Sequence, residues 1–203
     1  MNPKRAKRGR PRGTKKHGER RFLKEEEIRA FFKVAKKSKR DDLMFSLALY
    51  LGLRAGEIRG LKFEQINEDS REITIRGLKS GRQRTYELPE RIWKKYKAWM
   101  KVYPGGNGKF FFPHRLYKDE PMSIEGVKRA FKRVAQKAGL NGDVSVHNLR
   151  HTCSIELVKR GESPYVVQRW LRHKKLSSSE VYFEMFEDRE ADTRAKEYFG
   201  NYF

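Results

Sequence analysis

The chain has 203 residues, enough to bury one hydrophobic core but not two large ones, so we expect one domain, with or without an appendage, rather than a two-domain enzyme. Its 48 lysines and arginines outnumber its 26 acidic residues and leave a net charge of +22, whose sign attracts phosphate backbones and makes nucleic acid the first partner to consider. A single cysteine, Cys153, excludes an internal disulfide and a cysteine-rich zinc module, and without a long apolar run we expect neither a membrane span nor a signal peptide.

The first 21 residues form a basic arm. Ten of them are lysine or arginine and one, Glu19, is acidic, which gives the arm a charge of +9 with almost no apolar side chains. A segment of this composition cannot build a core, so we expect residues 1–21 to be disordered. Residues 22–203 still carry a charge of +13, so the arm does not account for the basic character of the folded part.

Within the arm, a Gly-Arg-Pro core flanked by basic residues resembles an AT-hook, a short element that lies in the minor groove of A/T-rich DNA. Its four residues are Arg8, Gly9, Arg10 and Pro11. Glycine allows close approach to the groove, proline keeps the segment extended, and arginine favours the negative potential of a narrow groove. The alternative is a polycationic tail that binds any polyanion, because short motifs arise easily in a basic segment.

Globular patterning follows the arm. Apolar side chains at helical spacing predict a first helix over about residues 24–37. A second helix is apolar along one face and is therefore expected to be central and buried; we expect it to begin at a cap formed by Asp41 or Asp42 and to end at Gly52. A short amphipathic turn is expected over residues 54–61.

Two short alternating runs then predict a β-hairpin. They cover residues 72–76 and 84–88 and are joined by a glycine-bounded loop at 77–81. Helical spacing resumes after the hairpin and predicts four further helices, over residues 89–102, 123–139, 147–160 and 163–172. The predicted fold class is mainly α (α+β), a helical bundle with one small antiparallel β-sheet and no internal repeat.

Three segments, taken in order along the chain, resemble the sequence boxes of the tyrosine recombinases, also called the phage integrase family. Residues 51–61 (LGLRAGEIRGL) resemble the first arginine box, and 146–152 (VHNLRHT) the His-x-x-Arg box. Residues 171–182 (LRHKKLSSSEVY) resemble the box that carries the second histidine and the nucleophile. Because the boxes span almost the whole folded part, the resemblance implies that residues 22–203 are a tyrosine recombinase catalytic domain, including a C-terminal tail.

The resemblance implies six catalytic residues, all of the type expected in an active enzyme. They are Arg54, Lys79, His147, Arg150, His173 and Tyr182. The family also uses the separations found here, 23 residues from Arg150 to His173 and nine from His173 to Tyr182. Lys79 is assigned by its place in the hairpin loop rather than by a box, so Lys62 and Arg82 remain alternatives for its role.

The chemistry of these residue types fits phosphoryl transfer. A phosphodiester under in-line attack gathers negative charge on its nonbridging oxygens, and the planar guanidiniums of Arg54 and Arg150 are suited to clamp them. His147 and Arg150 are three residues apart near a helix N-terminus, so we expect them to share a face where free N–H groups attract an anion. Arginines would do the electrostatic work of a metal, and the sequence has neither an acidic cluster for Mg²⁺ nor a Walker loop for ATP, so we expect no metal and no cofactor.

The resemblance also implies a role for each residue. Tyr182 attacks the scissile phosphate and forms a 3′-phosphotyrosyl link while the 5′-hydroxyl departs. Because a phenol has a pKa of about 10, it needs help from the cationic pocket and from His147 as proton acceptor or relay. Lys79 would protonate the leaving oxygen, and His173 would hydrogen-bond a nonbridging oxygen. Since the covalent link conserves the bond energy, the strand can be rejoined without ATP.

Neighbouring residues have simpler interpretations. Glu57 is expected to orient Arg54 or to cap local backbone rather than to act on substrate. We expect His151 to be structural and to bond backbone, and Cys153 to be a small buried apolar residue. Tyr182, taken alone, would be an aromatic residue on an amphipathic helix, so the assignment depends on the joint spacing of the boxes.

The chain departs from the family pattern in one respect. Most members place a helical core-binding domain before the catalytic domain, whereas here the first helix begins near residue 24, so we expect no core-binding domain. The chain therefore resembles the short, catalytic-domain-only members, such as the recombinases that invert fimbrial promoter switches; an engineered fragment is the alternative. The basic arm is expected to replace part of the missing DNA grip by counterion release.

The expected function is site-specific recombination or integration of double-stranded DNA. A type IB topoisomerase-like relaxing enzyme and a catalytically silent DNA-binding protein on the same scaffold are the alternatives. The aromatic residues beyond Tyr182 favour a partner surface, and the resemblance implies that the tail, residues 189–203, docks on a neighbouring protomer of a DNA-bound tetramer. We expect a cytoplasmic, nucleoid-associated protein without a membrane partner, encoded by the host or by a virus or mobile element.

Overall fold

The computed structural model describes residues 21–78, 81–104 and 108–183. It confirms the predicted fold class, because the described residues form eight α-helices, one short 3-10 helix and a three-stranded antiparallel sheet. Three predicted features lie outside the described residues: the AT-hook-like segment Arg8 to Pro11, Lys79, and the tail over residues 189–203.

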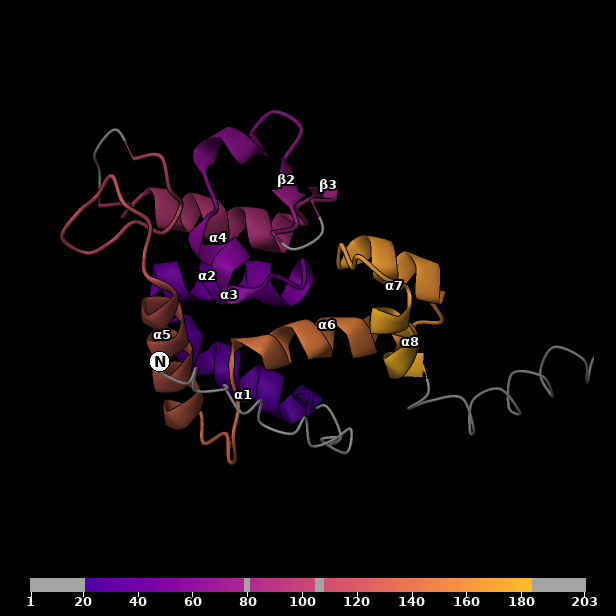
Figure 1. The fold of residues 1–203 in the computed structure, drawn as a ribbon. Helices are drawn as coiled ribbons and strands as arrows, with labels where there is room; N and C mark the ends of the chain where they lie inside the picture. Colours follow the sequence, from indigo (N-terminus) through magenta and orange to yellow (C-terminus); the bar gives the residue numbers. More distant parts are fainter. Residues whose placement is uncertain (1–20, 79–80, 105–107, 184–203) are drawn as a thin grey trace, which may run out of the picture.

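Figure 1 labels the α-helices, which are numbered in the order of the sequence. The first half contains α1 (Glu25–Ala35), α2 (Lys39–Tyr50), α3 (Ala55–Arg59), the 3-10 turn η1 (Phe63–Gln65) and α4 (Glu90–Met100). The second half contains α5 (Ile124–Lys137), α6 (Val146–Lys159), α7 (Pro164–Trp170) and α8 (Ser177–Phe183). The helices predicted from the sequence are therefore confirmed to within a few residues at their ends.

The start of α2 differs from the prediction. Ser38, and neither Asp41 nor Asp42, caps this helix, and its hydroxyl accepts the backbone N–H of Asp41. The two aspartates are instead buried in the first turn, where Asp41 pairs with Arg133 at 2.6 Å and Asp42 pairs with Lys95 at 2.6 Å. These ion pairs join the start of α2 to α5 and α4.

The folded body already includes Arg21, the last residue assigned to the basic arm. Its guanidinium pairs with Glu27 of α1 at 2.6 Å, and its carbonyl accepts the side-chain amide of Asn148 of α6 at 2.7 Å. The backbone N–H of Leu23 donates to the hydroxyl of Thr152, also on α6. The segment before α1 is therefore fastened to the first two turns of α6.

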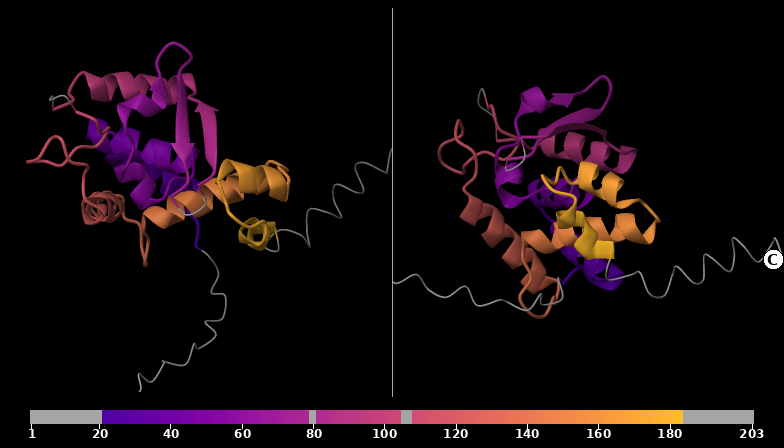
Figure 2. Two further views of the ribbon diagram at one scale, coloured as in Figure 1. Left: turned by 45° about the horizontal axis from the view of Figure 1, so that its top comes forward. Right: turned by 45° about the vertical axis from the view of Figure 1, so that its right-hand side comes forward.

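The sheet has the order β1–β2–β3, with β1 (Ile66–Asn67), β2 (Glu72–Arg76) and β3 (Gln83–Glu87). β2 and β3 form the predicted antiparallel hairpin, in which Thr74 lies opposite Thr85. The prediction lacks β1 because two residues are too few for an alternating pattern to appear. Figure 2 shows the sheet at the edge of the helical bundle, beside α4.

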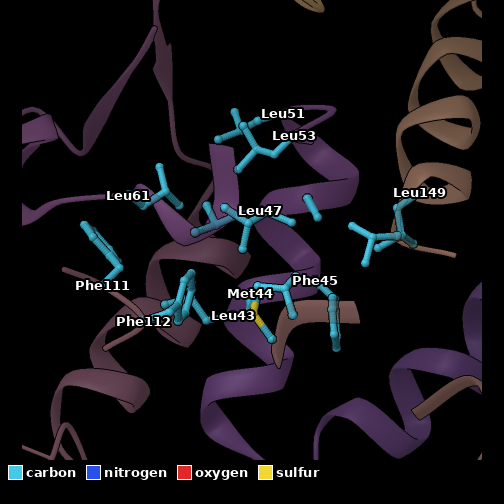
Figure 3. Close-up of a cluster of buried hydrophobic side chains, with 14 of the residues drawn as sticks. Leu43, Met44, Phe45, Leu47, Leu51, Leu53, Leu61, Phe111, Phe112 and Leu149 are labelled. Carbon is cyan, nitrogen blue, oxygen red and sulfur yellow. The ribbon is translucent and has the colours of Figure 1, made fainter. Parts of the chain in front are cut away.

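The main core is built around α2. All residues of this helix from Leu43 to Ala48 are buried, which confirms the prediction of a buried central helix. Figure 3 shows its side chains packed with others from later segments, among them Phe111, Phe112 and Leu149. Because Leu149 belongs to α6, the same core holds the first half of α6 in place.

The last helices form a smaller cluster against α6. α7 and α8 pack on each other and on α6, on the side of the molecule away from α5 (Figure 1). The buried side chains of this cluster are Cys153, Ile155, Val158, Val167, Leu171 and Tyr182. Cys153 is buried as predicted, and burial raises the pKa of its thiol to about 12. In the part of the chain that the structure describes, no helix is long and apolar enough to cross a membrane.

Candidate active site

Arg54 stands directly before α3, where the loop after α2 turns into the helix. Its backbone N–H and its guanidinium both donate to the carboxylate of Glu57, at 2.9 Å and 3.1 Å. Glu57 therefore caps α3 and orients Arg54 at the same time, as predicted. The Arg54 side chain keeps 24% of its surface exposed, so the guanidinium can still reach a ligand.

Arg150 lies on α6 and is almost completely buried, with 1% of its surface exposed. Its two terminal nitrogens donate to the backbone carbonyls of Gly52 and Leu171, the second at 2.6 Å. These two anchors fix the guanidinium plane between the segments that follow α2 and α7. Because the group is desolvated and Arg54 adds like charge, the pKa of Arg150 falls to about 10, although Glu57 acts in the opposite direction.

Gly52 makes the anchor on Arg150 possible. Its φ of +59° lies in the left-handed region, which glycine adopts without a steric penalty. A Cβ atom at this position would also collide with the side chain of Leu171. Glycine therefore lets the carbonyl of residue 52 approach Arg150 without backbone strain and without displacing Leu171.

Glu57 is the shared ion-pair partner of three guanidiniums. Its carboxylate lies 3.1 Å from Arg54, 3.2 Å from Arg172 and 3.9 Å from Arg150. Burial by itself raises the pKa of Glu57, but Arg172, the backbone N–H of Arg54 and the other two cations outweigh it and hold the pKa below its ordinary value of 4.5. One carboxylate among three cations leaves an excess of positive charge, which suits an anion-binding site.

His173 follows α7 and is buried. Its Nδ1 lies 2.8 Å from the hydroxyl oxygen of Ser179 on α8. Its backbone carbonyl accepts a hydrogen bond from the guanidinium of Arg82, beside β3, at 2.8 Å. Ser179 therefore orients the imidazole, and His173 joins the hairpin to the last two helices.

Tyr182 lies on α8 with 2% of its surface exposed. Its phenol oxygen is 2.8 Å from Nδ1 of His151 on α6. We expected a structural histidine that bonds backbone rather than substrate, and the structure places its Nδ1 against the side chain of Tyr182. No local pattern in the sequence shows which of two histidines, one helical turn apart, faces a side chain 31 residues away.

His147 occupies the first turn of α6, and its side chain is exposed. Its ring packs edge-on against His151, with 4.4 Å between the ring centroids. Ser145 caps α6 and accepts the backbone N–H of His147. The pair predicted to share a face, His147 and Arg150, thus has one member at the surface and the other in the interior.

Lys79 lies in the hairpin loop outside the described residues, and the structure shows only its two alternatives. Lys62 forms an ion pair with Glu64 at 3.2 Å on the turn η1. Arg82 contacts the carbonyl of His173, as described above. Of the two, Arg82 therefore has a contact with another predicted site residue.

Arg172 belongs to the guanidinium cluster but is absent from the predicted site. It directly precedes His173 in the third box, and nothing in its sequence position distinguishes it from the many other basic residues of this chain. Its burial and its contact with Glu57, 115 residues earlier, appear only in the folded structure.

Comparisons with known proteins show the family of the chain. A family model described as "Phage integrase family" matches residues 21–189. The chain belongs to the phage integrase family. A relative, tyrosine recombinase XerA of Pyrococcus furiosus, is 32% identical over 161 residues, which cover 79% of this chain and 56% of that protein. The type 1 fimbriae regulatory protein FimB of Escherichia coli is 28% identical over 163 residues, which cover 77% of this chain and 80% of that protein.

Solved structures of other family members share the fold. The crystal structure of XerA recombinase superimposes with a TM-score of 0.72 at 21% identity, over 90% of this chain and 61% of that chain. The XerH site-specific recombinase bound to its difH substrate superimposes with a TM-score of 0.68 at 23% identity, over 79% of this chain and 50% of that chain. The chain thus spans little more than half the length of these recombinases and has the fold of their catalytic domains.

Proposed function

We propose that this member of the phage integrase family is a site-specific recombinase, which cleaves and rejoins double-stranded DNA through a 3′-phosphotyrosyl intermediate without metal or ATP. The observation that carries the proposal is the environment of Tyr182. Its phenol contacts His151, which follows Arg150 on α6, and the carboxylate of Glu57 lies against both Arg150 and Arg54. A nucleophile, a base and two cationic donors from three separate segments therefore gather beside α6.

In this mechanism the two arginines act on the scissile phosphate. Arg150 is held by two backbone carbonyls, and the exposed part of Arg54 faces incoming substrate, so both can stabilise charge on the nonbridging oxygens. Tyr182 forms the bond to phosphorus while the bond to the 5′ oxygen breaks. Lys79 supplies the proton to that oxygen, and His173, oriented by Ser179, hydrogen-bonds the phosphate.

The phenolic proton needs an acceptor. His151 contacts the phenol oxygen at 2.8 Å, and His147 lies edge-on to His151 and nearer the surface. We therefore assign the first proton transfer to His151 and leave His147 to carry the proton onward or to contact the phosphate. Because Tyr182 is buried in the free protein, DNA binding or assembly has to loosen the contact between α6 and α8 before attack.

Two further parts of the chain belong to the proposal. The basic arm, with the segment Arg8 to Pro11, adds phosphate or minor-groove contacts, which its charge supports. Residues 189–203 dock on a neighbouring protomer and complete a tetramer on DNA, which their aromatic content supports. Truncation after Asp188 should then abolish synapsis in gel-shift assays while single-site binding and the thermal melt stay unchanged. A DNA-associated protein of the host cytoplasm, or of a mobile element, fits this activity.

The test of the proposed function is to trap the protein covalently on nicked double-stranded DNA and to sequence the trapped ends. We expect the wild-type protein to join to a defined 3′-phosphate position and the Tyr182→Phe variant to form no adduct. Relaxation of any supercoiled plasmid without a specific site would instead indicate a topoisomerase. DNA binding without adduct formation in the wild type would indicate a catalytically silent DNA-binding protein.

A further inference from the structure

Arg172 has a backbone conformation that residues other than glycine usually avoid. Its φ is +56°, in the left-handed region, and among the described non-glycine residues only Arg71 has a positive φ as well. Arg71 lies in an exposed turn and pairs with Glu90 at the surface, whereas Arg172 is buried. A strained buried residue persists only where the surrounding contacts hold it in place.

The contacts that hold Arg172 are made by its guanidinium. One terminal nitrogen donates to the carbonyls of Leu51 and Trp170, at 3.2 Å and 3.0 Å, and to the phenol of Tyr86. The other terminal nitrogen donates to the carboxylate of Glu57 at 3.2 Å. Nε is buried without a hydrogen-bond partner. The side chain is thus directed at Glu57 although one of its donors stays unsatisfied.

The backbone on either side of Arg172 contacts other arginines. The carbonyl of Leu171 accepts from Arg150 at 2.6 Å, and the carbonyl of His173 accepts from Arg82 at 2.8 Å. The left-handed turn at residue 172 lies between these two carbonyls and so determines their relative directions. Arg172 is therefore linked to Arg150 twice, through the neighbouring carbonyl and through Glu57.

We propose that Arg172 is a positioning residue of the active site, which holds Glu57 and thereby sets the guanidiniums of Arg54 and Arg150. The terminal nitrogens of Arg172 already donate to four acceptors within the protein, so we assign it to Glu57 rather than to DNA. Without it, Glu57 would keep Arg54 and the more distant Arg150 and would lose the nearer of its two buried cations. The step from positioning to phosphate binding rests on the proposed function, whereas the positioning itself does not.

Two substitutions separate positioning from folding. Arg172→Gly removes the guanidinium and accommodates the positive φ, and Arg172→Lys keeps the charge but loses the planar fork. Arg71→Gly is the matched control, because it relieves the same backbone conformation and removes an arginine from an exposed turn. Thermal melts of the full-length variants show whether each one folds.

The first measurement is made on the free protein by NMR of the arginine side chains. Fixed hydrogen bonds slow guanidinium rotation, so Arg150 and Arg54 should give resolved terminal N–H signals in the wild type and in Arg71→Gly. We expect these signals to merge or broaden in both Arg172 variants. Unchanged signals in both variants would overturn the proposal, and so would loss of folding in both, which would make Arg172 a purely structural residue.

The second measurement uses the nicked DNA found by covalent trapping, with either a phosphate or a methylphosphonate at the scissile position. Methylphosphonate lacks one nonbridging charge and therefore depends less on well-placed guanidiniums. We expect Arg172→Gly to cleave the phosphate substrate at least about tenfold more slowly than Arg71→Gly does. On the methylphosphonate substrate, the cleavage rates of these two variants should lie within about threefold of each other. Equal losses on both substrates would contradict the proposal. If the wild type cleaves neither substrate, the proposed function fails, and the NMR signals still decide the positioning role.

Discussion

The phenol oxygen of Tyr182 lies 2.8 Å from Nδ1 of His151, and the two residues come from different helices, 31 positions apart. Both side chains are buried, so this hydrogen bond fastens α8 to α6 in the free protein. It also keeps the proposed nucleophile beside a base and away from solvent. The contact gives the first two predictions.

Tyr182→Phe should abolish the covalent adduct and leave DNA affinity within about twofold, because the change removes the nucleophile and no charge. Loss of the phenol leaves His151 without this partner and should lower the free energy of unfolding by about 1–3 kcal/mol. Adducts are counted on denaturing gels, and affinity is measured by fluorescence anisotropy. Tyr165→Phe, at an exposed position, is the control. Adduct formation by the Tyr182 variant would move the nucleophile to another residue.

Substitution of the two histidines should distinguish the acceptor of the phenolic proton. His151→Leu should slow adduct formation on the order of 10²- to 10⁴-fold, because the base in contact with the phenol is lost. His147→Leu should slow adduct formation less, because the ring of His147 contacts His151 and lies behind it as seen from the phenol. Single-turnover cleavage rates at neutral pH provide the comparison, with thermal melts to confirm folding. The reverse order of rates would return the acceptor role to His147.

Arg150→Lys and Arg150→Ala should both fail to cleave efficiently, with the alanine variant worse. Lysine keeps the charge, but a single ammonium cannot reproduce the planar fork that reaches the carbonyls of Gly52 and Leu171 from two nitrogens. Removing the side chain leaves these buried acceptors unsatisfied, at about 1–3 kcal/mol each. Cleavage rates and urea unfolding curves are the measurements. A lysine variant with wild-type activity would show that charge alone suffices at this position.

Glu57→Gln should lower the free energy of unfolding by about 3–5 kcal/mol at neutral pH, because it leaves buried guanidiniums uncompensated. The folded-state pKa of Glu57 lies below 4.5, so below that pH the unfolded chain takes up a proton that the folded protein still excludes. The stabilisation is therefore complete above pH 4.5 and is lost as the pH falls through the lower folded-state pKa. Urea titrations at several pH values should show the gap between wild type and variant narrowing in acid. A gap that does not change with pH would assign the stabilisation to other groups.

Deletion of residues 1–20 should weaken DNA binding and flatten its dependence on salt, while Arg21 stays in place with the folded body. The deleted segment carries a net charge of +8, so the slope of log affinity against log salt should fall by at most about seven units. If the segment Arg8 to Pro11 acts as an AT-hook, the double substitution Gly9→Glu and Arg10→Ala should weaken binding more on A/T-rich than on G/C-rich flanks. Equal losses on both flanks would leave only a polycationic arm.

Much of this protein could be predicted from short stretches of its sequence. Helical periodicity and capping serines place most helices, since both depend on contacts within one or two turns. The three boxes likewise name Arg54, His147, Arg150, His173 and Tyr182 as site residues. Local patterns fail where the interaction is between distant parts of the chain. Aspartate is a residue type that often caps helices, but the partners of Asp41 and Asp42 are arginine and lysine side chains from α5 and α4.

The sequence by itself therefore determined the family, the mainly helical fold and the residue types of the site. Only the tertiary structure decided that His151 is the histidine that contacts Tyr182. It also decided that Glu57 pairs with three arginines and that Arg172 is one of them. These contacts depend on how α7 and α8 pack against α6 and on the loop that follows α2. Burial distinguishes these few arginines from the many others of the chain. A charge removed from water must lie against a partner, whereas an exposed charge need not.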